Sequence, residues 1–227
     1  MTVSRETSIA VFGEGLTAAV QFAELLAAVG VERGLIGPRE VERLWDRHLL
    51  NSAVVAEAIP EGARVVDLGS GAGLPGVPLA IARPDLEVTL LEPMARRVAW
   101  LTEVVDTLSL SAHVVRGRAE DPAIKQQLAG ADVVIARAVA PLARLWTWSA
   151  PLLRQGGRLV ALKGESAGEE VTRDGPAVTR AGGSLPVVEQ CGVGVLEVPT
   201  TIVVVERLNE QKSGRKPRRA GKHAQRH

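Results

Sequence analysis

The sequence predicts an α/β fold, in which a sheet of seven mostly parallel strands with an antiparallel last strand follows a helical N-terminal extension. Three observations lead to this prediction. From residue 65 onward, short runs of β-branched residues alternate with stretches of helical periodicity, which is typical of right-handed βαβ units. The first run ends in a glycine-rich turn. The last two runs are separated only by residues 192–200, a connection short enough for an antiparallel hairpin.

Helical patterns dominate the residues before the first strand. Residues 1–12 show no clear pattern, and we expect them to fray. Apolar residues recur at helical spacing over Leu16–Val29, and Gly30 ends that stretch. A second helix is predicted over Pro38–Ile59, and residues 60–62 break the chain before the first strand. We therefore divide the chain into an N-terminal extension, a ligand-binding domain and a tail: residues 1–60, 61–208 and 209–227.

Strand candidates and helices then alternate along the chain. The strand candidates are Val65–Leu68, Val88–Leu91, His113–Val115, Val133–Ala136, Arg158–Leu162, Pro186–Gln190 and Thr201–Val205. The clearest helices between them are Gly76–Ala82, Met94–Leu108 and Leu142–Leu152. A longer segment separates Leu162 from the last two strands. This order predicts a Rossmann-like sheet with helices on both faces.

Composition excludes several classes of protein. Hydrophobic residues make up 46% of the chain and charged residues 23%, as in a globular protein with a buried core. The single cysteine, Cys191, precludes an internal disulfide and fits a reducing compartment. No apolar run is long enough for a membrane span, and no His/Cys cluster has metal-ligand spacing. We therefore expect a cytoplasmic monomer without a metal or a membrane segment.

The net charge of +1 hides an asymmetry between the body of the chain and its end. Residues 211–227 contain seven Lys and Arg residues and no acid, so residues 1–210 hold 20 basic against 26 acidic residues, a net charge of −6. The tail has no apolar residue larger than alanine. It cannot contribute to a core, and we expect it to be disordered.

The most informative stretch is residues 64–76, Arg-Val-Val-Asp-Leu-Gly-Ser-Gly-Ala-Gly-Leu-Pro-Gly. Asp67 lies at the end of the first predicted strand, and Gly69, Gly71 and Gly73 follow at alternate positions. Such glycines allow backbone angles that other residues avoid, and they let a ligand approach peptide N–H groups closely. A helix N-terminus follows the loop. The stretch therefore predicts a site for a nucleotide-like ligand.

The loop alone does not identify this ligand. Residues 71–76 also satisfy the dinucleotide pattern G-x-G-x-x-G. Asp67 favours S-adenosylmethionine, since its carboxylate can accept from the ammonium group or from loop amides but would repel a pyrophosphate. Pro75 also departs from the close helix packing that dinucleotide sites need. Glu92, at the end of the next strand, can accept from both ribose hydroxyls of either cofactor.

Further candidate residues follow the later strands, because ligands bind beyond the carboxyl ends of an open parallel sheet. Ala119 and Glu120 can supply a backbone amide and a side-chain acceptor for adenine, although Glu120 is equally well explained as an acid in a helix first turn. Arg137 ends an apolar run, so this cation needs an anionic group of a ligand or an internal carboxylate. Lys163 follows another apolar run, where a plain surface lysine is also common.

Several of these motifs together resemble one protein family, the bacterial small-subunit (16S) ribosomal RNA guanine-N7 methyltransferases, also called the glucose-inhibited division protein B family. The resemblance extends from about residue 15 to about residue 207. It rests on Asp-Leu-Gly-Ser-Gly-Ala-Gly-Leu-Pro-Gly (67–76), Arg-Pro (83–84), Leu-Leu-Glu-Pro (90–93), Arg-Ala-Glu (118–120), Ala-Arg-Ala (136–138), Ala-Leu-Lys-Gly (161–164) and the helix 39–52.

This resemblance implies a class I methyltransferase sheet, S-adenosylmethionine as the cofactor, and ribosomal RNA or the small ribosomal subunit as the partner. By position, it implies cofactor contacts for Gly69, Leu74, Ala119, Glu120 and Arg137. The basic tail lies outside the shared part of the chain, so the resemblance says nothing of its role.

Methylation of guanine N7 has modest chemical needs. N7 carries an in-plane lone pair and no proton, so no general base is required and positioning supplies the catalysis. The four histidines then need no catalytic role, and His48 is expected to be a satisfied helix residue. A donor to guanine O6 would select the base, and Arg137 and Lys163 are the candidates.

Two alternatives remain open from the sequence. An NAD-dependent oxidoreductase would use the same glycine-rich loop. A non-catalytic RNA-binding protein on a Rossmann-like fold would bind RNA through the basic tail and transfer no methyl group.

Overall fold

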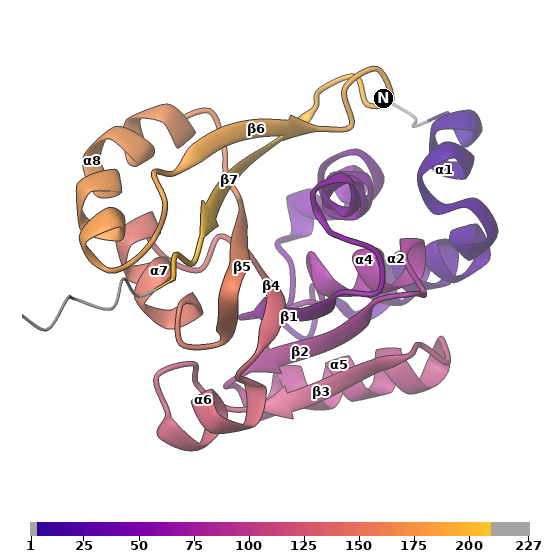
Figure 1. Cartoon of the computed structure of the whole chain (residues 1–227). Helices are drawn as coiled ribbons and strands as arrows, with labels where there is room; N and C mark the ends of the chain where they lie inside the picture. Colours follow the sequence, from indigo (N-terminus) through magenta and orange to yellow (C-terminus); the bar gives the residue numbers. More distant parts are fainter. Residues whose placement is uncertain (1–3, 210–227) are drawn as a thin grey trace, which may run out of the picture.

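The computed structural model describes residues 4–209, and its centre is one seven-stranded sheet in the order β3-β2-β1-β4-β5-β7-β6 (Figure 1). The strands are β1 (Arg64–Leu68), β2 (Glu87–Glu92), β3 (Ala112–Arg116), β4 (Ala131–Arg137), β5 (Leu153–Leu162), β6 (Val187–Cys191) and β7 (Thr200–Glu206). Strands β1 to β5 pair in parallel, whereas β7 runs antiparallel to both β5 and β6. The predicted strands and the antiparallel last strand are confirmed.

Helices cover both faces of the sheet (Figure 1). One face carries α4 (Gly76–Ala82), α5 (Ala95–Thr107) and the N-terminal helices, which share one apolar core. The other face carries α6 (Pro122–Leu128), α7 (Leu142–Ser149) and α8 (Ala167–Arg180), which share a second core. Alternate strand residues serve the two faces, so Val65 joins the first core and Val66 the second. The long segment after Leu162 therefore contains a helix, α8, which periodicity alone did not identify.

The N-terminal part is helical, as expected, but its details correct two expectations. Residues before 13 do not all fray, because α1 (Arg5–Phe12) is a regular helix whose N-cap, Ser4, accepts a hydrogen bond from the Thr7 amide. The buried Phe12 ring packs edge-on against Trp45 at 6.3 Å between centroids. This long-range contact stabilises a segment whose local pattern is weak.

The second predicted helix is not one continuous α-helix. After η1 (Gly13–Gly15) and α2 (Leu16–Val29), the chain forms η2 (Pro38–Arg43), the π-helix η3 (Leu44–Leu49), α3 (Leu50–Ala53) and η4 (Val54–Ala58). The wide π-turn changes which side chains face inward, and such turns are frequent at functional sites.

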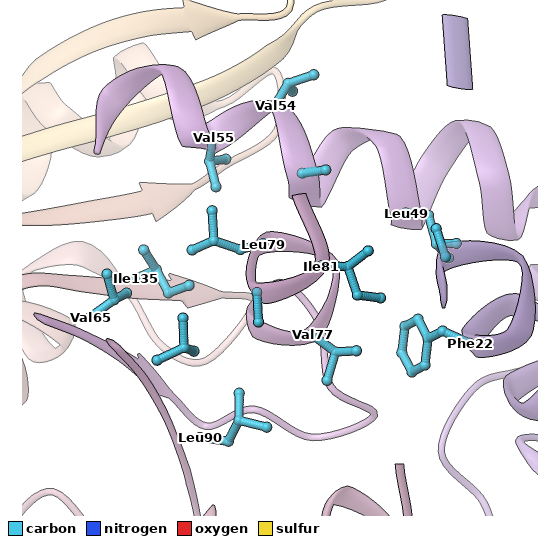
Figure 2. Packing of buried hydrophobic residues seen from close by; sticks show 14 of the residues in the cluster. Phe22, Leu49, Val54, Val55, Val65, Val77, Leu79, Ile81, Leu90 and Ile135 are labelled. Carbon is cyan, nitrogen blue, oxygen red and sulfur yellow. The ribbon is translucent and has the colours of Figure 1, made fainter. Parts of the chain in front are cut away.

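Figure 2 shows how α4 joins the N-terminal helices to the sheet. Val77, Leu79 and Ile81 of α4 lie between sheet residues and the N-terminal side chains Phe22 and Leu49 (Figure 2). The N-terminal helices thus bury apolar surface in the same core as the sheet. The boundary that we place at residue 60 stays a prediction.

One helical run in the described part of the chain is long and apolar enough, by length and composition, to cross a membrane. It is Arg5–Val29, with 25 residues and a mean hydropathy of 1.4 in its most apolar window. Phe12, Phe22 and Leu26 of this run are buried in the core, which gives its apolar residues a packing role. The expectation of a chain without a membrane segment stays a prediction. The predicted disorder of the tail concerns residues outside 4–209.

Candidate functional site

A cavity of about 720 Å³ lies beyond the carboxyl ends of β1 to β4, and its size is that of a small-molecule site. Each of these strands contributes the residues that follow it. The N-terminal segment and α7 complete the wall. The lining residues that matter below are Gly69, Gly71, Leu74, Glu92, Ala119, Glu120 and Arg137 from the predicted set, with Glu40, Arg47, His48, Met94, Arg97 and Trp148 in addition.

The glycine-rich loop after β1 has the backbone that its sequence predicts. Gly69, Gly71 and Gly73 have φ values of +78°, +56° and +100°, in the left-handed region that favours glycine. A Cβ on Gly69 would lie 3.1 Å from Val139 of the β4 loop, so the absent side chain also permits a close approach. Gly69 and Gly71 line the cavity, whereas Gly73 packs behind it against Val77.

Most amides of this loop already have acceptors within the protein. The amides of Gly69 and Ser70 donate to the Leu91 carbonyl, at 2.8 and 3.2 Å, and those of Gly73 and Leu74 donate to the Ser70 carbonyl. The Gly71 amide donates to Glu92 at 3.0 Å. Because these N–H groups point at protein oxygens, the loop does not offer the open amide cradle that phosphate sites use.

Asp67 lies beneath the loop and not in the cavity. Its side chain is fully buried, and its Oδ2 accepts a hydrogen bond from the Gly76 amide at the start of α4, at 3.0 Å. Its Oδ1 has no hydrogen-bond partner among the described residues. Burial raises the pKa of Asp67 to about 7, and the nearby Glu92 carboxylate acts in the same direction. Of the two partners that the sequence allowed, the structure gives Asp67 the loop amide.

Glu92 ends β2 and faces both the loop and the cavity. Its side chain is 2% exposed, and its two oxygens accept from the Gly71 amide at 3.0 Å and from the Met94 amide at 2.9 Å. Arg97 of α5 lies 3.9 Å away. A carboxylate so held keeps a fixed orientation and retains lone pairs for a diol ligand.

The wall formed by the ends of β2 and β3 is largely apolar. Leu91, Pro93, Met94 and the buried Ala119 lie there, and the side chain of Glu120 is exposed at its edge. An apolar slot with polar groups at its edge, here Arg118 and Glu120, suits a heteroaromatic ring. The predicted place of Ala119 and Glu120 is therefore compatible with adenine, and their binding role stays a prediction.

Arg137 ends β4 and is a half-buried cation whose side-chain hydrogen-bond partners are Ser52 and His48. It donates toward Ser52 Oγ at 3.5 Å and to His48 Nδ1 at 2.6 Å. Within residues 4–209 no carboxylate forms a salt bridge with it. Burial and the nearby Arg47 lower the pKa of Arg137 from its ordinary value. Such a cation favours an anionic or strongly accepting ligand group in the cavity.

Lys163 directly follows β5 and does not line the cavity. Its Nζ donates to the Ala140 carbonyl at 3.2 Å and to Glu170 Oε1 of α8 at 2.9 Å. Glu170 also accepts from the Leu142 amide at 2.7 Å, at the start of α7. Lys163 thus anchors the segment between β4 and α7, and its predicted contact with a reacting base stays untested.

Sequence reasoning missed the cavity residues of the N-terminal segment. Glu40 and His48 were assigned no site role, yet both line the cavity and contact one another at 2.6 Å. Arg47, Arg97 and Trp148 line it as well. For Glu40, Arg47 and His48 the one signal was the helix 39–52 within the family resemblance, because no local pattern tells which helix face meets a distant strand end.

The cavity as a whole suits a ligand with a diol beside Glu92 and an accepting group beside Arg137. Glu92 lies at the loop and holds the Gly71 amide, so a pyrophosphate would meet negative charge where a dinucleotide site offers free N–H groups. Within residues 4–209 no group of His, Cys, Asp and Glu is arranged to hold a metal ion. The residues therefore fit S-adenosylmethionine better than NAD.

Comparisons with known proteins agree with this geometry. Residues 16–194 match the model of the GidB family, described as rRNA small subunit methyltransferase G. Ribosomal RNA small subunit methyltransferase G of Rhodococcus jostii (strain RHA1) is 57% identical over 206 residues, covering 90% of each chain. The protein of that name from Corynebacterium jeikeium (strain K411) is 56% identical over 198 residues, covering 87% of this chain and 89% of its own.

Similarity to solved structures concerns the fold alone. A putative S-adenosyl-L-methionine-dependent methyltransferase from Methanococcus maripaludis superposes with a TM-score of 0.57 at 15% identity, covering 78% of this chain and 94% of its own. The seven-stranded sheet of this chain is therefore the class I methyltransferase sheet that the sequence predicts.

Proposed function

The chain belongs to the family of rRNA small subunit methyltransferase G, and on that premise we propose that its cavity binds S-adenosylmethionine and directs the methyl group to N7 of a guanine in small-subunit (16S) ribosomal RNA. The main structural support for the proposal is the loop after β1, whose amides donate to backbone carbonyls and to the Glu92 carboxylate. Family membership and this loop favour a methyltransferase over the two alternatives left by the sequence.

We assign each part of the cofactor to residues that line the cavity. We assign the ribose hydroxyls to Glu92, whose carboxylate is fixed by two backbone amides. Adenine occupies the apolar wall beside Met94 and Ala119, with Glu120 at its edge. Gly69 permits close approach of the remainder of the cofactor to the backbone.

Bound S-adenosylmethionine supplies an electrophilic sulfonium methyl group, so the chain itself has to supply position and not acid–base chemistry. Guanine N7 has a free lone pair and no proton to remove. Holding such a nucleophile in line at contact distance provides most of the rate acceleration. The cavity lining accordingly needs no general base.

Arg137 is the residue best placed to orient the reactants. It lines the cavity at the end of β4 and has no carboxylate partner of its own within residues 4–209. Its guanidinium can donate to the cofactor carboxylate or to guanine O6, an acceptor beside N7. We expect the target base in a loop or turned out of its stack, since bases within RNA helices are poorly accessible.

The setting of the reaction is also proposed. Ribosomal RNA as substrate and a single buried free thiol, Cys191, fit the reducing cytoplasm, and we propose that the protein acts there as a monomer. Whether naked RNA or the assembled small subunit is modified is decided by offering both.

The test is methyl transfer from labelled S-adenosylmethionine to unmodified small-subunit RNA and to small subunits. Cleavage of the product by borohydride and aniline, which act at N7-methylguanine, locates the base. Arg137→Ala should fold and transfer the methyl group poorly. Arg154→Ala, which removes an exposed cation paired with Asp132 at 2.5 Å, is the matched control and should stay active. A product methylated on another atom, or no transfer to either substrate, would overturn the proposal.

A further inference from the structure

A chain of three side chains joins the N-terminal segment to the end of β4. Glu40 of η2 and His48 of η3 meet at 2.6 Å, between Oε2 and Nε2. On the other side of the ring, His48 Nδ1 lies 2.6 Å from Arg137 Nη2. All three residues line the cavity, and the histidine is only 7% exposed. No step of the proposed reaction uses Glu40 or His48.

The chemistry of these groups determines where the protons lie. A guanidinium has donors and no acceptor, so His48 Nδ1 must accept from Arg137 and carries no proton. The remaining ring proton is then on Nε2 and is donated to the Glu40 carboxylate. His48 is therefore a neutral ring in one tautomer, fixed on both sides by charged partners.

The backbone explains how His48 reaches this position. It lies within the π-helix Leu44–Leu49, where the wider turn places the ring between η2 and the end of β4. The other contact of the guanidinium, to Ser52 Oγ, is long at 3.5 Å. The short bond to His48 is therefore the main protein contact that orients Arg137.

We propose that Glu40 and His48 are positioning residues, which hold the Arg137 guanidinium in the orientation that binding of the cofactor or of the guanine requires. This inference rests on the proposed function, since it assumes that Arg137 meets one of the reactants. It assigns the N-terminal segment a part in the site beyond its packing on the sheet.

The arrangement makes the site sensitive to acid. Burial and the Arg137 charge lower the pKa of His48 below its ordinary value, so the neutral ring persists at neutral pH. The charged groups facing the ring are Glu40 from η2, Arg137 from β4 and Arg47 from η3. As pH falls through the pKa of His48, Nδ1 gains a proton, the acceptor is lost, and two cations face each other.

Two nearly isosteric substitutions separate the two ring nitrogens. His48→Asn places an amide oxygen near the position of Nδ1, so it keeps an acceptor for Arg137 and loses the link to Glu40. His48→Gln places its amide near Nε2, so it keeps the link to Glu40 and leaves Arg137 without an acceptor. For a purely structural role, the longer glutamine should be the better replacement.

We expect methyl transfer to fall about tenfold or more in His48→Gln and clearly less in His48→Asn. Melting temperatures and calorimetric affinity for S-adenosylmethionine are measured on the same full-length proteins. Activity that follows the melting temperatures, with glutamine equal to or better than asparagine, would overturn the inference.

The unaltered enzyme gives a second test that needs no variant to fold. Its methyl transfer, or its cofactor affinity, should decline as pH falls below about 6.5, the ordinary pKa of histidine, while the fold persists. His48→Asn should lack this decline. A flat profile in the unaltered enzyme refutes the positioning role, whereas absent transfer to ribosomal RNA at every pH refutes the proposed function instead.

Discussion

Replacing Asp67 by asparagine should change how the stability of the protein depends on pH. The Asp67 carboxyl is fully buried, has one backbone donor and leaves Oδ1 unpartnered within the described residues. Burial raises its pKa from 3.8 to about 7. A carboxyl raised in this way contributes stability that is fully present below pH 3.8 and is lost as pH rises through 7.

The structure also gives the size of the effect. A pKa difference of about 3 corresponds to about 4 kcal/mol between the two ends of this pH range, at about 1.4 kcal/mol for each pKa unit. The asparagine side chain would have the same shape as the carboxyl, would still accept from the Gly76 amide and would stay neutral. The unfolding free energy of Asp67→Asn, minus that of the unaltered protein, should therefore rise by about 2–4 kcal/mol from about pH 4 to about pH 8.

Urea unfolding followed by tryptophan fluorescence at several pH values measures this difference, and groups common to both proteins cancel. Asp85→Asn is the matched control. The Asp85 carboxylate pairs with Arg83 at 2.6 Å and accepts from the Gly62 amide, which holds its pKa well below the ordinary value. Its stabilisation is present above pH 3.8 and is lost only as pH falls below that value, so the control difference should stay nearly constant from about pH 4 to about pH 8. A difference for Asp67→Asn that is constant with pH would refute a neutral buried Asp67.

Three further substitutions test the loop, its packing and the tail. Glu92→Ala should weaken S-adenosylmethionine binding at least about tenfold in calorimetry, and it should also lower the melting temperature because two backbone amides lose their acceptor. Glu92→Gln should lose affinity with a smaller loss of stability. Unchanged affinity in both variants would contradict the ribose assignment. Gly76→Ala should destabilise the fold by about 1–3 kcal/mol in thermal unfolding, because the added Cβ would lie 2.4 Å from Cδ2 of Leu90. An unchanged melting temperature would show that α4 can shift to make room. Deleting residues 211–227 should leave cofactor affinity unchanged and make RNA binding less dependent on salt. The slope of log binding constant against log salt concentration should fall by about 0.7 for each lost phosphate contact. Equal slopes for the full-length and shortened proteins would show that the tail does not bind RNA.

Local sequence patterns were sufficient to predict the sheet and the glycine-rich loop. Apolar runs such as residues 133–136 and the helical periodicity between them are local features of the sequence. The alternation of strands and helices can therefore be predicted without tertiary contacts. The positive φ angles at Gly69, Gly71 and Gly73 likewise follow from residue type.

The N-terminal segment was predicted less well because distant contacts decide its conformation. Helix α1 forms although its local signal is weak, since Phe12 packs against Trp45. The turn at residues 44–49 widens to a π-helix, which a periodicity of 3.6 residues does not anticipate.

The sequence alone predicted the glycine-rich loop, the two acidic residues beside it and the cation at the end of β4, because each depends on the residue type at a strand end. The groups that these residues face are known only from the folded chain. Folding placed Asp67 under the loop, directed Lys163 to Glu170, and brought His48 to Arg137 across a separation of 89 residues. Packing of the whole chain determines which distant residues come into contact. The sequence around either residue therefore does not predict its partner.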